Sequence, residues 1–225
     1  MKILAGTDFH GFRPAFESFA EEAKMQEVNL VILSGDVTNF GTVDQAKSLL
    51  SILLKTDIPV FFVPGNCDPP SLINLNLNGL KCTHGVGVSY GELSFIGIGG
   101  SPITPFKTFF EMKEDEIAEI LRGCINSLGS EIKRHDVILI SHSPPKDTKL
   151  DRTSLGMHVG SVSIRKFIEE QKPLMVICGH IHEAKGRDSI NNTVIVNPGP
   201  AKQGSCAVIM VKERKVEIEF RSLRI

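Results

Sequence analysis

The sequence is poor in residues that mark several common classes of protein, with no tryptophan, one tyrosine and five cysteines in 225 residues. The cysteines are odd in number and scattered without a C-x-x-C pair, which argues against a disulfide framework or a thiolate zinc site and favours a reducing, cytoplasmic location. The shortage of tryptophan and tyrosine argues against stacking on single-stranded nucleic acid. The formal net charge is -1, and no block of lysine and arginine marks a duplex-binding surface. We therefore expect no long nucleic acid as a partner.

Long apolar runs are missing as well. The first ten residues, MKILAGTDFH, become polar at Asp8, too early for a signal peptide, and no segment reaches the roughly 20 apolar residues of a membrane span. The apolar content of 41% still supplies material for a sizeable core, and 23% charged residues suit a solvated surface. We predict one domain over residues 1–225 without membrane attachment, and the sequence makes no prediction of the oligomeric state.

Apolar periodicity predicts strands that alternate with helices over most of the chain. Lys2–Thr7 is a short apolar run that suits a strand buried on both faces, and Pro14–Lys24 repeats apolar residues at helical spacing behind a proline in its first turn. The further predicted strands are Leu30–Leu33, Val60–Val63, Leu93–Ile98, Val137–Ile140, Leu174–Cys178, Thr193–Val196, Cys206–Val211 and Val216–Phe220. The further predicted helices are Val43–Leu54, Glu114–Ile125 and Val162–Glu170. This order predicts a mixed sheet, or two sheets, covered by helices.

Metal-capable side chains follow five of these predicted strands, each group within a few residues of the strand's carboxyl end. The groups are Asp8 with His10, Asp36, Asn66 with Asp68, His142, and His180 with His182. In open α/β sheets this is the edge at which ligands bind. Nitrogen and oxygen donors without a thiolate suit manganese, iron, zinc or similar ions. One carboxylate can bridge two such ions, and a pair about 3.5–4 Å apart can clamp both oxygens of a phosphoryl transfer.

Each group taken alone has an ordinary structural interpretation. An aspartate and a histidine two residues apart after a strand more often form a turn or a helix cap. Gly35-Asp36 is also a common turn dipeptide. The functional interpretation gains weight because all five groups fall at the same kind of position. Five of the seven histidines lie in or beside these groups when His158 is counted, which buried structural histidines would not be expected to do.

The ordered motifs resemble those of the calcineurin-like metallophosphoesterases, whose pattern is D-x-H, G-D, G-N-[HC]-[DE], H and G-H-x-H. This chain contains Asp8-Phe9-His10, Gly35-Asp36, Gly65-Asn66-Cys67-Asp68, His142 and Gly179-His180-Ile181-His182. It is most similar to the small prokaryotic phosphodiesterase branch, in which G-N-C-D replaces the more common motif. The resemblance implies a four-layer α/β sandwich with two central mixed β-sheets flanked by helices.

The resemblance also implies a set of roles and an activity. Two divalent metal ions per chain are expected, with manganese ahead of nickel, iron, zinc or cobalt. The first ion would be held by Asp8, His10 and His182, the second by Asn66, His142 and His180, and both by the bridging Asp36. The implied activity is hydrolysis of phosphodiester bonds in a small phosphate-ester substrate by a metal-activated hydroxide. A phosphomonoesterase and a non-catalytic metal-binding scaffold of the same fold are the alternatives, and the enzyme is favoured because every ligand position is filled.

At the position of the proton donor the chain departs from the more common family pattern, because Cys67 stands where many relatives have a histidine. A thiol with an ordinary pKa near 8.5 is a poorer acid than an imidazole near 6.5. We therefore expect that Cys67 is not the general acid. His158 is the competing candidate, with Asp68 orienting a neighbouring group. Lys146, Lys149 and Arg152 are weaker candidates for contacts with the substrate phosphate.

Overall fold

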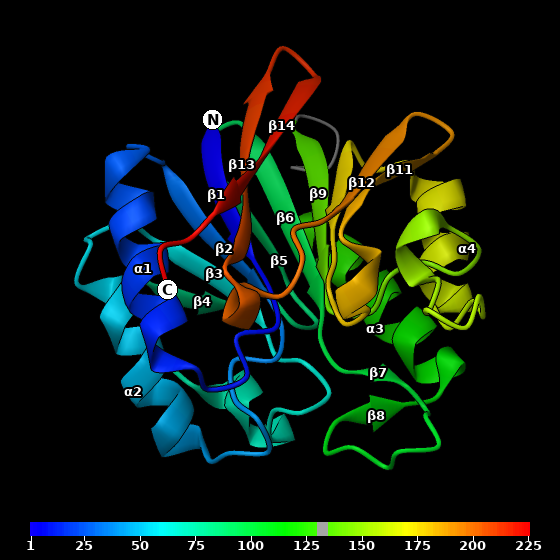
Figure 1. The fold of residues 1–225 in the computed structure, drawn as a ribbon. Helices are drawn as coiled ribbons and strands as arrows, with labels where there is room; N and C mark the ends of the chain where they lie inside the picture. The colour runs from blue at the N-terminus through cyan, green and yellow to red at the C-terminus, as the bar shows by residue number, and fades with distance from the viewer. Residues whose placement is uncertain (130–134) are drawn as a thin grey trace.

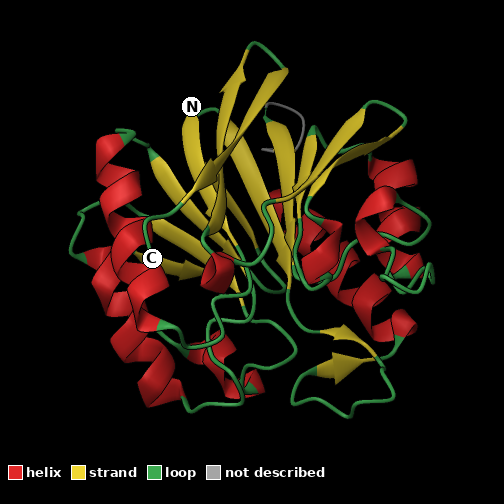
Figure 2. Ribbon diagram, in the orientation of Figure 1, coloured by secondary structure: helices red, strands yellow, loops and turns green. Residues whose placement is uncertain are grey.

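The computed structural model describes residues 1–129 and 135–225, and two six-stranded sheets form its centre (Figure 1, Figure 2). The first sheet has the order β14-β13-β1-β2-β3-β4, in which β1 to β4 are parallel and the hairpin of β13 and β14 joins antiparallel to β1. Its strands are β1 (Lys2–Gly6), β2 (Leu30–Ser34), β3 (Val60–Val63), β4 (Leu80–Cys82), β13 (Ser205–Lys212) and β14 (Lys215–Ser222).

The second sheet has the order β11-β12-β10-β9-β6-β5. Its four middle strands are parallel, while β11 and β5 are antiparallel edge strands. Its strands are β5 (Gly87–Tyr90), β6 (Leu93–Ile98), β9 (Asp136–Ser141), β10 (Met175–Ile177), β11 (Gly186–Ile190) and β12 (Thr193–Asn197). A small parallel pair, β7 (Ser101–Pro102) and β8 (Glu111–Met112), lies below the second sheet in the view of Figure 1.

Helices cover the outer face of each sheet and complete four layers. The long helices are α1 (Arg13–Met25) and α2 (Val43–Leu54) on the first sheet, and α3 (Glu114–Leu128) and α4 (Val162–Gln171) on the second. Short 3-10 helices are η1 (Pro70–Asn74), η3 (Lys149–Asp151), η4 (His182–Ala184) and η5 (Ala201–Gln203). Ser161 caps α4 by accepting from the Ile164 N–H at 3.1 Å, one reason that the chain turns helical there.

Three apolar clusters hold these layers together, one under each pair of helices and one between the sheets. The strand period of two explains the division, because successive side chains point to opposite faces. In β1, Leu4 packs under the helices while Ile3 faces the second sheet. In β9, Leu139 packs toward α3 and α4 while Ile138 faces the first sheet. Both faces of the central strands are therefore buried, as their continuous apolar runs predict.

The predicted fold class, two mixed sheets flanked by helices, is confirmed. The predicted strands and helices recur within a few residues of their expected bounds, whereas β4, β5, β11 and the short pair β7 and β8 were not predicted. These missed strands are short or half-exposed, so they lack the apolar runs on which the prediction rested. The expectation of one domain over residues 1–225 stays a prediction.

The parallel strands of both sheets deliver their loops to one end of the sandwich, which we call the carboxyl end. A hydrogen bond joins the two sheets there, from the ring nitrogen Nδ1 of His142 after β9 to the carbonyl of Ser34 at the end of β2, at 2.8 Å. The loops after β1, β2, β3, β9 and β10 therefore meet across the gap between the sheets. No helix in the described part of the chain is long and apolar enough to cross a membrane.

Candidate metal centre

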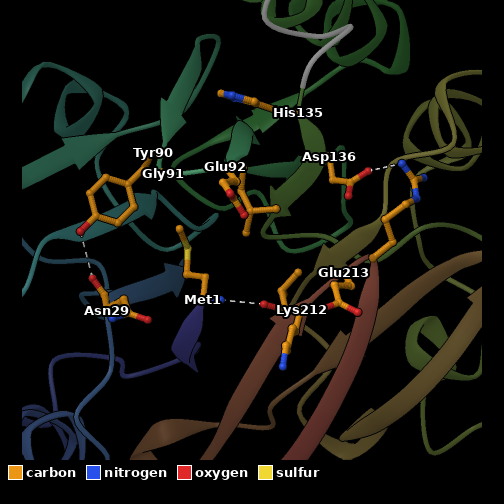
Figure 3. A pocket seen from close by; sticks show the side chains of 12 residues that line it. Met1, Asn29, Tyr90, Gly91, Glu92, His135, Asp136, Lys212 and Glu213 are labelled. Carbon is orange, nitrogen blue, oxygen red and sulfur yellow. Dashed lines mark hydrogen bonds and ion pairs between the residues drawn. The ribbon is translucent and has the colours of Figure 1, made fainter.

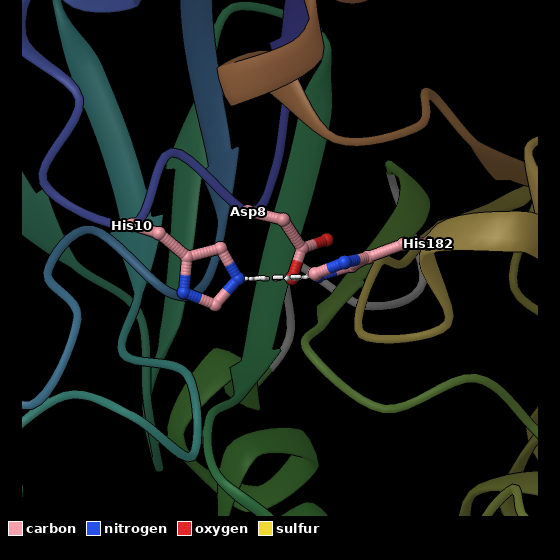
Figure 4. Close-up of side chains that lie close together, drawn as sticks. All are labelled: Asp8, His10 and His182. Atoms are coloured by element: carbon pink, nitrogen blue, oxygen red, sulfur yellow. Dashed lines mark hydrogen bonds and ion pairs between the residues drawn. The ribbon is translucent and has the colours of Figure 1, made fainter.

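Three of the predicted ligands converge from opposite sheets in Figure 4. The Nε2 atoms of His10 and His182 face each other at 3.1 Å, and Asp8 Oδ1 lies 3.2 Å from the same His182 nitrogen. The other oxygen of Asp8 accepts hydrogen bonds from the Thr7 hydroxyl and the His180 backbone N–H, at 2.8 and 3.0 Å. Asp8 is therefore held by one oxygen, and its other oxygen faces the two imidazoles.

A second group lies beside the first and shares Asp36 with it. Asp36 Oδ2 lies 3.5 Å from His10 Nε2, while Asp36 Oδ1 lies 3.6 Å from His142 Nε2. The same His142 nitrogen is 2.8 Å from Asn66 Oδ1. Asp36 thus presents one oxygen to each group, which is the arrangement that a bridging carboxylate requires.

The donor atoms suit cations because lone pairs face one another. His142 Nδ1 must donate to Ser34, since a carbonyl oxygen only accepts. In the neutral ring its Nε2 then carries a lone pair, yet it points at another acceptor, the carbonyl oxygen of Asn66. A cation between these atoms turns this repulsion into attraction. The ring of His10 is also directed at the centre: its Nε2 faces His182, while its Nδ1 is buried without a hydrogen-bond partner among the described residues.

His180 is the predicted ligand that the structure joins least directly to the others. Its backbone N–H donates to Asp8, and its ring lies at 5.0 Å from the ring of His142, edge to face. The structure therefore brings all seven predicted ligands to the carboxyl end of the sheets. Their assignment to a first and a second ion stays a prediction.

Several ligand residues have a strained backbone conformation. Asp8, His10, Asp36 and His180 all have positive φ angles, from 46° to 70°, in the left-handed region that non-glycine residues seldom adopt. Such conformations cost on the order of 1–3 kcal/mol each and persist where the surroundings over-determine them. Gly35 has a φ of 100°, and a β-carbon there would collide with the His142 ring. The glycine before Asp36 therefore lets the second sheet's histidine approach.

Burial and neighbouring charges shift the pKa values of several side chains in the metal-free centre. Burial raises the pKa of Asp36 to about 7, whereas burial lowers the pKa of His10 to about 4 and that of His180 to about 3. Burial also works against ionised Asp8, but the hydrogen bond with His182 and the nearby imidazoles hold the pKa of Asp8 well below its usual range. His142 shifts the other way from His10 and His180: burial opposes its charged form, but the charges of Asp36 and Asp8 raise its pKa. Burial thus keeps His10 and His180 neutral, which is the form in which an imidazole can hold a metal ion.

Asp68 ties two ligand loops together. Its buried carboxylate accepts from the backbone N–H groups of Gly65, Val37 and Thr38 and from the Thr38 hydroxyl, at 2.7 to 3.0 Å. Burial raises the pKa of Asp68 although these four donors oppose the shift. With both oxygens occupied, Asp68 positions the loops after β2 and β3.

Cys67 is buried beside the centre as a neutral thiol. Its backbone N–H donates to Asp36 Oδ1 at 2.8 Å, and its sulfur lies 3.7 Å from the Asn66 side-chain amide. Burial, followed by the charge of Asp36, raises the pKa of the thiol far above its ordinary value. The thiol is therefore neutral in the metal-free centre, and the expectation that Cys67 is not the general acid stays a prediction.

His158 is oriented by Asp151, a partner that the sequence did not indicate. Its Nδ1 lies 2.7 Å from Asp151 Oδ1, and the carboxylate is fully buried while the histidine side chain is 38% exposed. The surrounding hairpin is fixed near the centre, because the Ser154 N–H donates to Glu183, the residue after His182, at 2.9 Å. His158 is therefore a partly exposed histidine held in place by Asp151, and its role as proton donor stays a prediction.

Lys202 was not among the predicted site residues. Its backbone N–H lies 3.3 Å from the carbonyl of Asp8. After burial, the charge of Lys202 is the next cause that lowers the pKa of His10, while the charge of Asp8 opposes the shift. It follows the Asn197-Pro198-Gly199 segment by three residues, which is the only sequence signal for it. Lys146, which the sequence offered as a phosphate contact, instead donates to the His158 carbonyl at 3.3 Å.

A hollow lies at the opposite end of the sandwich, which we call the amino end (Figure 3). It measures about 1220 Å³ and is lined by Met1, Tyr90, Glu92 and Arg214 among others. The Met1 amino group donates to the Val211 carbonyl at 2.6 Å, and Arg214 pairs with Asp136 across the rim. This region holds none of the predicted metal ligands.

Comparison with known proteins identifies the class that these features define. The family model of calcineurin-like phosphoesterases matches residues 1–184. The uncharacterized protein MJ1162 of Methanocaldococcus jannaschii is 38% identical over 206 residues, which cover 89% of this chain and 88% of that protein. The chain belongs to the calcineurin-like phosphoesterase family. Membership supports metal-dependent hydrolysis of phosphoester bonds in a family that uses two metal ions, and the observed Asp/His clusters can bind metal.

Solved structures share the fold at low sequence identity. The protein TT1561 of Thermus thermophilus aligns with a TM-score of 0.73 and 19% identity over 97% of both chains. A dimetal phosphatase from Danio rerio aligns with a TM-score of 0.71 and 13% identity, over 99% of this chain and 96% of that chain. An archaeal phosphodiesterase aligns with a TM-score of 0.57 and 13% identity, over 98% and 99%. At these identities the likeness concerns the fold.

Proposed function

We propose that this protein is a dinuclear-metal-dependent phosphodiesterase that acts on small substrates. The observation that carries the proposal is the position of Asp36, whose two oxygens face His10 in one donor group and His142 in the other. A single-ion site would need only one of these groups. The family membership supports the same reaction class, hydrolysis of a phosphoester bond.

The residues of the centre would divide the work of holding two ions. Asp8, His10 and His182 would hold the first ion, and Asn66, His142 and His180 the second. Bound ions of this kind supply Lewis-acid stabilisation of the phosphoryl oxygens and an activated water. The hydrogen bonds to Asp8, Asp36 and His142 keep these side chains oriented, so that little reorganisation is needed when ions and substrate arrive.

Phosphodiesters are favoured over phosphomonoesters on two grounds. The G-N-C-D motif around Cys67 resembles that of the small prokaryotic phosphodiesterase branch, and an archaeal phosphodiesterase shares the fold. Among the described residues, Lys202 is the positive side chain whose charge acts on His10. A diester carries one negative charge fewer than a monoester dianion, so it needs less positive charge around it.

The test is a panel of bis(p-nitrophenyl) phosphate and p-nitrophenyl phosphate with manganese, nickel or magnesium. We expect faster hydrolysis of the diester, with manganese or nickel more effective than magnesium. Asp36→Asn protein purified in the same way controls for a contaminating phosphatase. A preference for the monoester with every metal would overturn the diester assignment. An absence of turnover with ions bound would favour a non-catalytic scaffold.

A further inference from the structure

The phenylalanines of this chain are unevenly distributed between core and surface. Of 13 phenylalanines, four are exposed by 41% to 83%, and all four lie in loops at the carboxyl end. These four are Phe12, Phe40, Phe106 and Phe109. Exposed aromatic side chains gathered in one region are unusual on a protein surface and mark contact sites.

Backbone hydrogen bonds join the loops of Phe40 and Phe109 to the segment that carries the predicted ligand Asn66. The Phe40 N–H donates to the carbonyl of Cys67 at 3.1 Å, and the N–H of Phe110, next to Phe109, donates to the carbonyl of Asn66 at 3.1 Å. The rings of Phe40 and Phe109 meet edge to face, with centroids 5.1 Å apart. We call Phe40, Phe106 and Phe109 the aromatic rim. It is built directly onto the loop that carries Asn66.

The β7–β8 loop that carries Phe106 and Phe109 is an ordered platform. The Glu111 carboxylate accepts from the backbone N–H and the hydroxyl of both Thr104 and Thr108, at 2.6 to 3.2 Å. These bonds hold the pKa of Glu111 at about 2, although burial opposes the shift. Phe106 nevertheless remains 83% exposed. The loop therefore displays an apolar ring in a fixed frame instead of burying it.

We propose that the aromatic rim selects phosphodiesters that carry a flat aromatic group on the alcohol that is not expelled, such as a nucleobase or an aryl ring. This inference rests on the proposed phosphodiesterase function and adds the substrate class. A phosphate held at the centre would place its spectator alcohol within reach of loops tied to Asn66 and Cys67. An aromatic spectator can pack on the exposed faces or edges of the phenylalanine pair. Stacking of a base on an aromatic side chain is tolerant of sequence and needs no hydrogen bond.

The test separates the spectator group from the leaving group. Four p-nitrophenyl diesters share the same leaving p-nitrophenoxide and differ in the second alcohol, which is methanol, cyclohexanol, phenol or the 5′-hydroxyl of thymidine. We expect kcat/KM for the phenyl and thymidine diesters to exceed that for the methyl diester by roughly tenfold, within the range of base–aromatic stacking. The difference should lie mainly in KM, because the spectator does not react. The cyclohexyl diester should fall below the phenyl diester.

Rim variants then locate the preference. Phe109→Ala and Phe40→Ala should bring the phenyl-to-methyl ratio of kcat/KM close to one, and Phe109→Leu should restore only part of it. Glu111→Gln should lower the ratio less, because it loosens the loop but keeps the rings. Met25→Ala, which removes a 61% exposed apolar side chain at the end of α1, is the matched control and should keep the ratio.

The outcomes distinguish this inference from the function on which it rests. Hydrolysis of all four diesters with equal kcat/KM overturns the inference and leaves the phosphodiesterase intact. Hydrolysis of none overturns both. Equal kcat/KM for cyclohexyl and phenyl diesters also contradicts aromatic selection. Sedimentation with phosphatidylglycerol vesicles that is lost in Phe106→Ala, with an unchanged phenyl-to-methyl ratio in Phe109→Ala, would instead make the rim a membrane contact and overturn the proposal.

Discussion

The two ends of the sandwich differ in both shape and chemistry. The amino end has a hollow of about 1220 Å³, and its polar groups pair with each other, as Met1 does with Val211 and Arg214 with Asp136. The carboxyl end instead brings side-chain nitrogens and oxygens from both sheets together, as His10 does with His182 and His142 with Asn66. A hollow alone therefore does not mark a functional site in this fold. Side-chain nitrogens and oxygens that converge and can bind a metal ion are the stronger sign of one.

Asp36→Asn should show the largest effect if the carboxyl end carries the activity. Changes to residues behind metal ligands typically cost about 10- to 100-fold, so loss of the shared carboxylate should lower kcat/KM for bis(p-nitrophenyl) phosphate by at least about 100-fold. Asp8→Asn should weaken mainly one ion. Kinetics combined with metal titration measure both. A nearly silent Asp36→Asn would remove the bridging assignment.

The titration of His84 tests whether a histidine outside the set of predicted ligands lowers the stability of the fold in acid. Its Nδ1 accepts the Gly99 N–H at 2.9 Å, and burial lowers its pKa from 6.5 to about 4. As pH falls below 6.5, the unfolded chain binds a proton that the folded chain refuses until about pH 4. The free energy of unfolding should therefore fall by up to about 3 kcal/mol over this interval.

His84→Asn supplies the comparison, because its amide oxygen can accept the same N–H without titrating. Urea unfolding of the metal-free protein at several pH values should give a flatter profile for this variant than for the wild type. Identical profiles would show that His84 is not responsible for the acid sensitivity.

Cys67 should matter less than its place among the ligands suggests. Cys67→Ala removes a weak contact with the Asn66 amide, so it should cost less than about fivefold in kcat/KM, equivalent to about 1 kcal/mol. Without a strong acid at this position, aryl diesters should react far faster than alkyl diesters. Cys67→His should gain most on alkyl diesters. Abolished turnover in Cys67→Ala with ions still bound would give the thiol a direct role.

His158→Ala separates the remaining sources of the proton. General acid catalysis typically contributes about 100- to 10,000-fold. A loss confined to poor leaving groups would assign the proton to His158, and Asp151→Asn should then reduce the same rates by disturbing its orientation. Equal rates would assign the proton to solvent.

Arg214→Ala should have the smallest effect of these substitutions, because Arg214 lies at the amino end of the sandwich. The Arg214 side chain is 74% exposed in its pair with Asp136, and exposed ion pairs contribute about 0–1 kcal/mol. We expect unfolding free energy to change by less than about 1 kcal/mol and kcat/KM to remain at the wild-type value. A large loss of activity would show that the amino end takes part in function.

The sequence predicted the ligands better than their surroundings. Asp8, Asp36 and His142 follow buried apolar strands, so their common edge could be inferred from periodicity and strand direction. Lys202 and Asp151 were missed because their roles depend on contacts between distant segments or on a loop's internal shape. The exposed Phe109 could not be separated from core phenylalanines, since composition does not say which apolar side chains a loop leaves uncovered.

Metal content tests the central claim most directly. The wild-type protein, incubated with manganese or nickel and freed of excess ion, should contain two divalent ions per chain by elemental analysis. Asp36→Asn should contain fewer, while Arg214→Ala should match the wild type. Well under one ion per chain in the wild type would contradict a dinuclear centre at the carboxyl end.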